Sequence, residues 1–237
     1  MSHASSPHRR MLGARLVARL PGLQAASWRL EAQPQGLFLL WLAYMGLLAS
    51  GAWLMWWRGV WAMLLQADPT GLTLAILLVF VAGSLWVGQR AWYLGQQRAW
   101  VLLPPRQRPA HSWRQRFDAD CQRWDLTAAR DLLAERCQGA HEMGWWVNGI
   151  LVKLGLLGKV IGFSILAFEL GHIESFDPAH TAQVLKSLTG GLGVALLTTM
   201  TGLAANMLLG VQLMRLDRYG DALIMDVLSP EPIDGAP

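Results

Sequence analysis

Residues 145–168 read WWVNGILVKLGLLGKVIGFSILAF. Among these 24 residues only Lys153 and Lys159 are charged, and most of the others are aliphatic, aromatic or glycine. An apolar helix of about 20 residues is long enough to cross the ~30 Å hydrocarbon core of a bilayer. The stretch therefore predicts a transmembrane helix, which we place at 145–170.

Three further stretches, 35–57, 69–89 and 187–214, contain no charged residue and are also long enough to cross a bilayer. From them we predict transmembrane helices at about 37–57, 71–94 and 188–214. The whole chain is 53% hydrophobic and 15% charged, whereas about a quarter of a typical soluble domain is charged. The sequence thus predicts an all-α integral membrane protein with four transmembrane helices and a short cytoplasmic helical section.

The arginines predict the orientation of these helices. Loops rich in Lys and Arg stay on the cytoplasmic side of a membrane. With the N-terminus inside, sixteen of the seventeen arginines fall on the cytoplasmic side, and only Arg58 falls outside. We therefore expect both termini to be cytoplasmic. The net charge of +4 follows from this bias, and no motif indicates nucleic-acid binding.

This topology divides the chain into five parts. They are a basic cytoplasmic arm (1–36), two peripheral, lipid-facing transmembrane helices (37–94), a cytoplasmic helical section (95–144), a channel region (145–217) and a cytoplasmic tail (218–237). The arm is either an interfacial helix on the anionic inner leaflet or a disordered tail. In the cytoplasmic section, the spacing of Phe117, Cys121, Trp124 and Ala128 predicts one amphipathic helix over 112–138.

Both cysteines, Cys121 and Cys137, fall in the cytoplasmic section, and we expect free thiols there. Neither has a His or Cys at the spacing of a metal site, so we expect no metal and no cofactor. The spans contain no Ser/His/Asp set, phosphate loop or carboxylate pair, and the sequence therefore does not indicate an enzyme.

The third and fourth spans are richer in small and polar residues than the first two. Small residues let membrane helices approach closely, and hydroxyls or amides bond across the contact. On the third span Lys159 lies about 14 residues, roughly 21 Å, beyond residue 145, which is near mid-membrane. On the fourth, Thr199, Gly202 and Asn206 share a face at a similar depth. Two such faces indicate a pore wall or a partner-binding surface.

The motifs LGLLGKVIGF at 154–163 and VALLTTMTGLAAN at 194–206 resemble those of the MotA/TolQ/ExbB proton-channel family, which have the forms LGLxGTVxG and ALxxTxxGLxxA. Four spans with both termini inside are similar to the MotA arrangement. The resemblance implies a subunit of a proton-motive-force-driven motor in the bacterial inner membrane. It also implies a homopentamer around a single-span partner of the MotB, TolR or ExbD type, whose membrane aspartate carries protons.

The resemblance also assigns residues. It implies that three glycines of the first motif pack the helices: Gly155, Gly158 and Gly162. It implies that five residues line the pore and the proton pathway: Lys159, Thr198, Thr199, Gly202 and Asn206. Two positions depart from the family pattern, because Lys159 stands where the motif has threonine and Val194 stands where TolQ- and ExbB-like members have glutamate. At the outer end of the third span, Glu169 and His172 are either a proton-access site or an interfacial polar rim.

A charged lysine at the centre of a membrane helix costs roughly 2.5–3.5 kcal/mol, so the role of Lys159 is a central question. Four roles remain open: a lysine held at a subunit contact, an ion pair with the partner's aspartate, a neutral amine that relays protons, and a substitution that blocks the path. Lys153 lies nearer the inner end, where its side chain reaches the interface. Two functions therefore stand side by side: a proton-channel subunit, and a non-conducting structural scaffold in which Lys159 blocks or locks the pathway.

Overall fold

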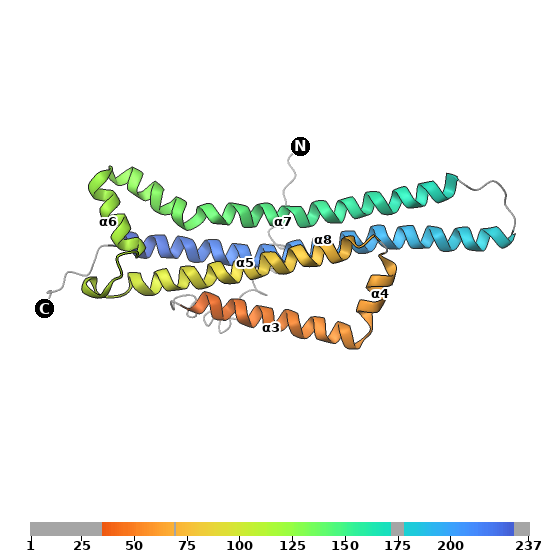
Figure 1. Ribbon diagram of the computed structural model, residues 1–237, viewed down its shortest axis with the longest axis horizontal. Coiled ribbons are helices and arrows are strands. Elements are labelled where there is room, and N and C mark those ends of the chain that lie inside the picture. The colour runs from red at the N-terminus through yellow and green to blue at the C-terminus, as the bar shows by residue number, and fades with distance from the viewer. Residues whose placement is uncertain (1–34, 69, 172–177, 230–237) are drawn as a thin grey trace, which may run out of the picture.

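The computed structural model describes residues 35–68, 70–171 and 178–229. These residues form six α-helices and one short 3-10 turn, Pro105–Gln107 (Figure 1). The helices are α3 (Gly36–Trp57), α4 (Val60–Ala67), α5 (Leu72–Val101), α6 (Trp113–Arg123), α7 (Leu126–Gly171) and α8 (Pro178–Leu228). Four of them, α3, α5, α7 and α8, are long and apolar enough to cross a membrane, as the sequence predicted for a multi-pass membrane protein.

The two longest helices, α7 and α8, run antiparallel and share the most extensive helix contact; α7 lies along one side of the molecule, and α8 lies between α7 and α3 (Figure 1). Helix α5 packs along both of them, and α3 packs on α5. The short helix α4 connects α3 to α5 at one end of the molecule, and α6 lies at the other end. In α3 only Gly36 and Leu37 are buried.

Both central helices extend well beyond the predicted spans. Helix α7 has 46 residues and α8 has 51, so they measure about 69 and 77 Å, more than twice the thickness of a hydrocarbon core. Outside the apolar stretches, α7 and α8 remain in contact with each other. On α7 the buried residues Ala129, Leu133 and Cys137 repeat every four positions, and the Cys137 thiol donates to the carbonyl of Gly220 on α8 at 3.4 Å.

The prediction of one amphipathic helix over 112–138 is wrong. Helix α6 ends at Arg123, and α7 begins at Leu126 after two non-helical residues. The second of these residues, Asp125, starts the new helix, because its carboxylate accepts hydrogen bonds from the Thr127 hydroxyl and from the Ala128 amide. Such a side-chain cap satisfies amides that lack partners in the first turn of a helix. Trp124 is left 60% exposed instead of joining the predicted apolar face.

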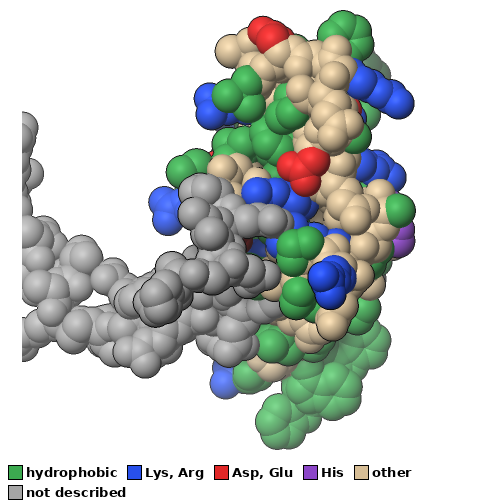
Figure 2. Space-filling model, turned by 90° about the vertical axis from the view of Figure 1, so that its left-hand side faces the viewer, with side chains coloured by type: hydrophobic (Ala, Val, Ile, Leu, Met, Phe, Trp, Pro, Cys, Tyr) green, Lys and Arg blue, Asp and Glu red, His purple; other side chains and the backbone are tan. Residues whose placement is uncertain are grey.

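Helix α5 buries polar groups as well as apolar ones at the end that carries α6. The guanidinium of Arg98 lies 2.8 Å from the Asp226 carboxylate of α8 and stacks over the ring of Tyr219 at 5.0 Å. Arg90 donates to the carbonyls of Arg136 and Cys137 on α7, each at 3.0 Å. Figure 2 looks onto this end and shows Lys and Arg side chains gathered on it. These bonds tie α5 to both central helices.

Asp68, in the turn between α4 and α5, provides a pH-dependent contribution to stability. It is 6% exposed, and its carboxylate accepts from the amide and hydroxyl of Thr70 and from the amide of Thr73 at 2.6 Å. Burial raises the pKa of this carboxyl, but the hydrogen bonds from Thr70 and Thr73 lower it by more, so its pKa lies below the ordinary value.

We expect Asp68→Ala to destabilise the chain at pH 7 by about 1 kcal/mol, the usual value of a helix cap. Because the pKa of Asp68 is lower in the folded chain, this contribution is present above the unfolded pKa of about 3.9 and is lost as the pH falls through the folded pKa. Thermal unfolding in detergent, followed by circular dichroism from pH 7 to pH 3, measures it. A difference between the two chains that stays constant over this pH range would contradict the assignment.

Candidate functional site: a polar ladder on the α7–α8 hairpin

Helices α7 and α8 approach closely where the predicted glycines lie. A methyl group at Gly162 would lie 2.7 Å from both the Ala195 nitrogen and the Gly191 oxygen. One at Gly202 would lie 2.8 Å from the Leu151 oxygen and 2.9 Å from the Cα of Gly155. These neighbours are mostly backbone atoms, which cannot move aside as a flexible side chain can. Glycine at these positions therefore sets the distance between the two helices.

Polar side chains follow one edge of this contact. On α7 they are His141, Asn148 and Lys159, and on α8 they are Thr199, Asn206 and Asp217. In both rows the intervals are seven and then eleven residues, which are close to two and three full helical turns. Each row therefore keeps to one side of its helix. We call these six residues the polar ladder.

Hydrogen bonds link ladder residues to the facing helix. The Thr199 hydroxyl lies 2.7 Å from the carbonyl oxygen of Ala195 on its own helix and 3.2 Å from that of Gly155 on α7, and it donates between them. The Asn206 amide donates to the carbonyl of Asn148 at 2.9 Å. At the far end, one oxygen of Asp217 lies 2.8 Å from Nδ1 of His141, and the other accepts from the indole of Trp145 at 2.9 Å. The bonded positions thus run from His141 to Gly155 on α7 and from Thr199 to Asp217 on α8.

The other helices pack on the opposite side of the hairpin. The Tyr44 hydroxyl of α3 donates to the carbonyl of Leu208 at 3.1 Å, and the Gln212 amide donates to Ser84 of α5 at 3.0 Å. Leu208 and Asn206 are two residues apart, which is about 200° around a helix. The ladder edge is instead flanked by Phe163 and Leu203, which are 43% and 44% exposed. In the described part of the chain this edge is thus partly exposed.

The structure separates the five residues that the resemblance assigned to a pore. Lys159 is exposed on the ladder edge, and Thr199 and Asn206 are half-buried there. Thr198 is fully buried, with its hydroxyl donating to the carbonyl of Val194 at 2.7 Å. Gly202 lies in the helix contact. Thr198 and Gly202 therefore hold the two helices together within one chain.

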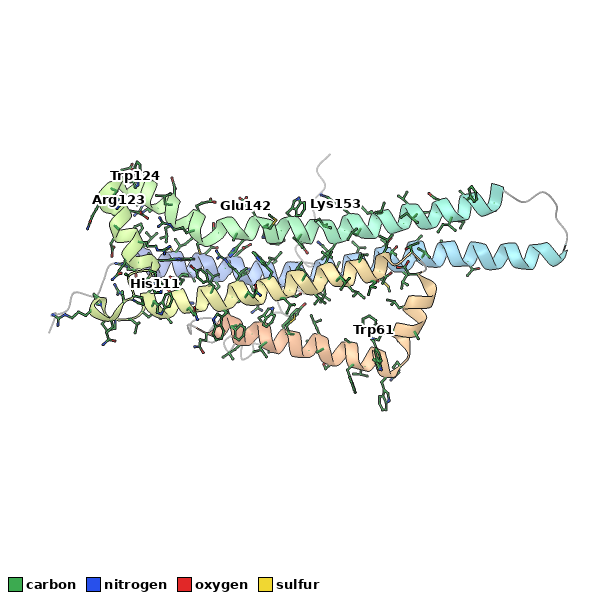
Figure 3. The ribbon with its side chains drawn as sticks, in the orientation of Figure 1. Trp61, His111, Arg123, Trp124, Glu142 and Lys153 are labelled. Carbon is green, nitrogen blue, oxygen red and sulfur yellow. The ribbon has the colours of Figure 1, made fainter. Side chains whose placement is uncertain are left out.

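Other predicted positions lie away from the ladder or outside the described side chains. Val194 is 2% exposed, and it lies five residues, about 140° of helix rotation, from Thr199. Lys153 is exposed on α7 (Figure 3). Six residues before Lys159, it lies about 120° of rotation away from the ladder. The side chains of Glu169 and His172 lie outside the described part of the chain.

Sequence reasoning missed the ladder residues His141, Asn148 and Asp217. They share the seven- and eleven-residue intervals with the predicted residues, and that regular spacing was the available signal. His141 and Asp217 also line a cleft of about 410 Å³ at the end of the ladder. The cleft has three further acidic side chains in its wall, those of Asp131, Glu135 and Glu142. The ladder therefore ends at a cleft whose wall contains several titratable side chains.

No family model, curated protein or solved structure matches this chain.

Proposed function

We propose that this chain is the membrane subunit of a proton-motive-force-driven motor, and that protons move between its α7–α8 hairpin and the membrane helix of a partner chain. The polar ladder carries the proposal. In a bilayer an edge that exposes Lys159 beside the half-buried Thr199 and Asn206 is costly unless the edge faces protein or water. The order and spacing of the two glycine-containing motifs, which resemble the MotA/TolQ/ExbB family, add support.

In this proposal the chain supplies the wall of the pathway, and the partner supplies the proton carrier. Several copies, five by the family resemblance, surround a MotB-, TolR- or ExbD-like single-span chain with their ladders turned inward. The oxygen of the Thr199 hydroxyl can accept a hydrogen bond from the partner's membrane aspartate when that aspartate is protonated, and the second N–H of the Asn206 amide can donate to it when it is ionised. His141 and Asp217 then accept or release the proton at the acidic cleft. The membrane would be the bacterial inner membrane.

A second candidate function is a non-conducting scaffold of the same architecture, and the exposure of Lys159 on the ladder edge favours it. In a ring, one lysine per copy would place several amines around the pathway. If these amines are charged, they repel protons. Alternatively, a charged amine holds the partner's aspartate in an ion pair. In both cases the complex would still assemble, but proton flow through it would be suppressed.

Both candidates require the ladder edge to face another protein chain, and photo-crosslinking in cells tests this requirement. We expect p-benzoylphenylalanine in place of Phe163, one helical turn beyond Lys159, to form adducts with protein. The control is the same residue in place of Trp53, which is 73% exposed on the peripheral helix α3. There we expect at most one-tenth of the protein adduct. Equal protein adducts at the two positions, or none at 163, would contradict the proposal.

A further inference from the structure

A groove of about 310 Å³ lies between α3, α5 and α8, on the side of the molecule opposite the ladder. Its wall is almost entirely apolar and includes Leu40, Ala43 and Leu47 of α3 and Val211 of α8. Only Tyr44, Gln212 and Arg215 contribute polar groups, apart from the indole nitrogen of Trp41. Since α3 and α8 are both apolar enough to cross a membrane, the groove lies where lipid is the solvent.

Three hydrogen bonds fix the walls of the groove. The Trp41 indole donates to the carbonyl of Ser84 at 3.0 Å, and the Gln212 amide donates to the hydroxyl of the same serine at 3.0 Å. The Tyr44 hydroxyl reaches the carbonyl of Leu208 at 3.1 Å. These bonds hold α3 beside α8. They use the donor groups of Trp41, Tyr44 and Gln212. What remains for an occupant is a narrow apolar space.

The width of this space decides which occupant it takes. An α-helix with its side chains is about 10–12 Å across, too wide for a groove whose two walls are joined by the bond from Tyr44 to Leu208. Most of the wall offers no polar partner to a water molecule, although the side-chain oxygen of Gln212 is buried there without a hydrogen bond. A single acyl chain matches the apolar character of the rest of the wall.

Arg215 gives the groove a charged end. It is the first charged residue after the uncharged stretch 187–214, and it belongs to the groove wall. A helix leaves the hydrocarbon core where such a stretch ends, so the guanidinium lies at headgroup depth. Basic pockets between membrane helices bind anionic headgroups, and a guanidinium pairs well with phosphate. We infer that this groove binds an anionic phospholipid, with one acyl chain between α3 and α8 and its phosphate at Arg215.

Lipid titration of the purified full-length chain tests the inference. After delipidation in detergent, the chain is titrated with phosphatidylglycerol or with phosphatidylcholine of the same acyl composition, and bound lipid is counted by native mass spectrometry. We expect phosphatidylglycerol to bind at least tenfold more tightly than phosphatidylcholine. Arg215→Gln should reduce that preference to less than twofold. The matched control is Arg218→Gln, one turn further along α8 and outside the groove wall, and it should keep the preference.

Two further measurements examine the acyl-chain part of the site. Ala43→Phe fills the groove and should weaken both lipids by tenfold or more. In native membranes, p-benzoylphenylalanine in place of Leu40 should form adducts with phospholipid. Equal affinity for the two lipids in the native chain, or equal loss in Arg215→Gln and Arg218→Gln, would overturn the inference. So would a protein adduct in place of lipid at position 40, because it would make the occupant a second chain. None of these outcomes depends on proton flow.

Discussion

Gly162→Leu is expected to lower the thermal unfolding temperature of the detergent-solubilised chain by roughly 6–12 °C, the shift that corresponds to about 3 kcal/mol of overpacking in a chain of this size. Even the first side-chain atom has no space, because it would lie 2.7 Å from the backbone nitrogen of Ala195 and from the backbone oxygen of Gly191. The two helices must therefore separate or rotate. Either movement also breaks the hydrogen bonds that join the two rows of the ladder.

Gly193→Leu is the matched control for this change. Gly193 lies on α8 between Gly191 and Ala195, the two residues that Gly162 of α7 contacts. A methyl group at Gly193 would meet no neighbouring atom within 4 Å. We expect its unfolding temperature to stay within about 2 °C of the native value, as for an exposed substitution of less than 1 kcal/mol. Equal shifts for the two variants would mean that helix propensity or detergent, and not the contact between α7 and α8, determines the result.

Lys159→Thr is expected to raise proton flux through the assembled complex by about tenfold or more. At an effective dielectric constant of 20, a charge ~10 Å from a moving proton adds about 1.7 kcal/mol, which corresponds to somewhat more than a factor of ten in rate. Lys159 is exposed on the ladder edge, so a ring of copies multiplies this effect. Threonine is also the residue at this position in the motif that the sequence resembles.

Lys153→Thr is the control for the lysine variant, because both lysines are exposed on α7 but only Lys159 lies on the ladder edge. We expect the flux of Lys153→Thr to stay within twofold of the native value. The measurement uses sealed vesicles, a potassium diffusion potential and an internal pH-sensitive dye. If both variants raised the flux equally, a general change in surface charge would account for the result, and Lys159 would have no special position.

The sequence predicted the four candidate spans because a soluble domain seldom contains uncharged apolar stretches of this length. It did not predict that α7 and α8 continue far beyond those stretches. There the contact depends on a few residues at helical spacing, such as Leu133 and Cys137, and their polar neighbours resemble those of any soluble helix. The break at Trp124 was missed because an Asp that caps a helix looks the same in a sequence as one on a solvent-exposed face.

The candidate site was predicted in part for a similar reason. Thr198 and Thr199 are adjacent, and only the rotation of α8 against α7 shows that the first is buried in the contact and the second lies on the ladder. His141 and Asp217 lie at or beyond the ends of the apolar stretches, where polar residues are ordinary. Their pairing depends on the antiparallel register of two long helices, which the sequence alone does not specify.

Proton flux in the native complex is the most direct test of the proposed function. The complex is the full chain together with the single-span protein captured through position 163, purified without crosslinker and sealed into vesicles. We predict flux above that of empty vesicles, and its loss when the partner's membrane aspartate is changed to asparagine in a complex of unchanged mass. A native complex that assembles but conducts no more than empty vesicles would contradict the proton-channel function.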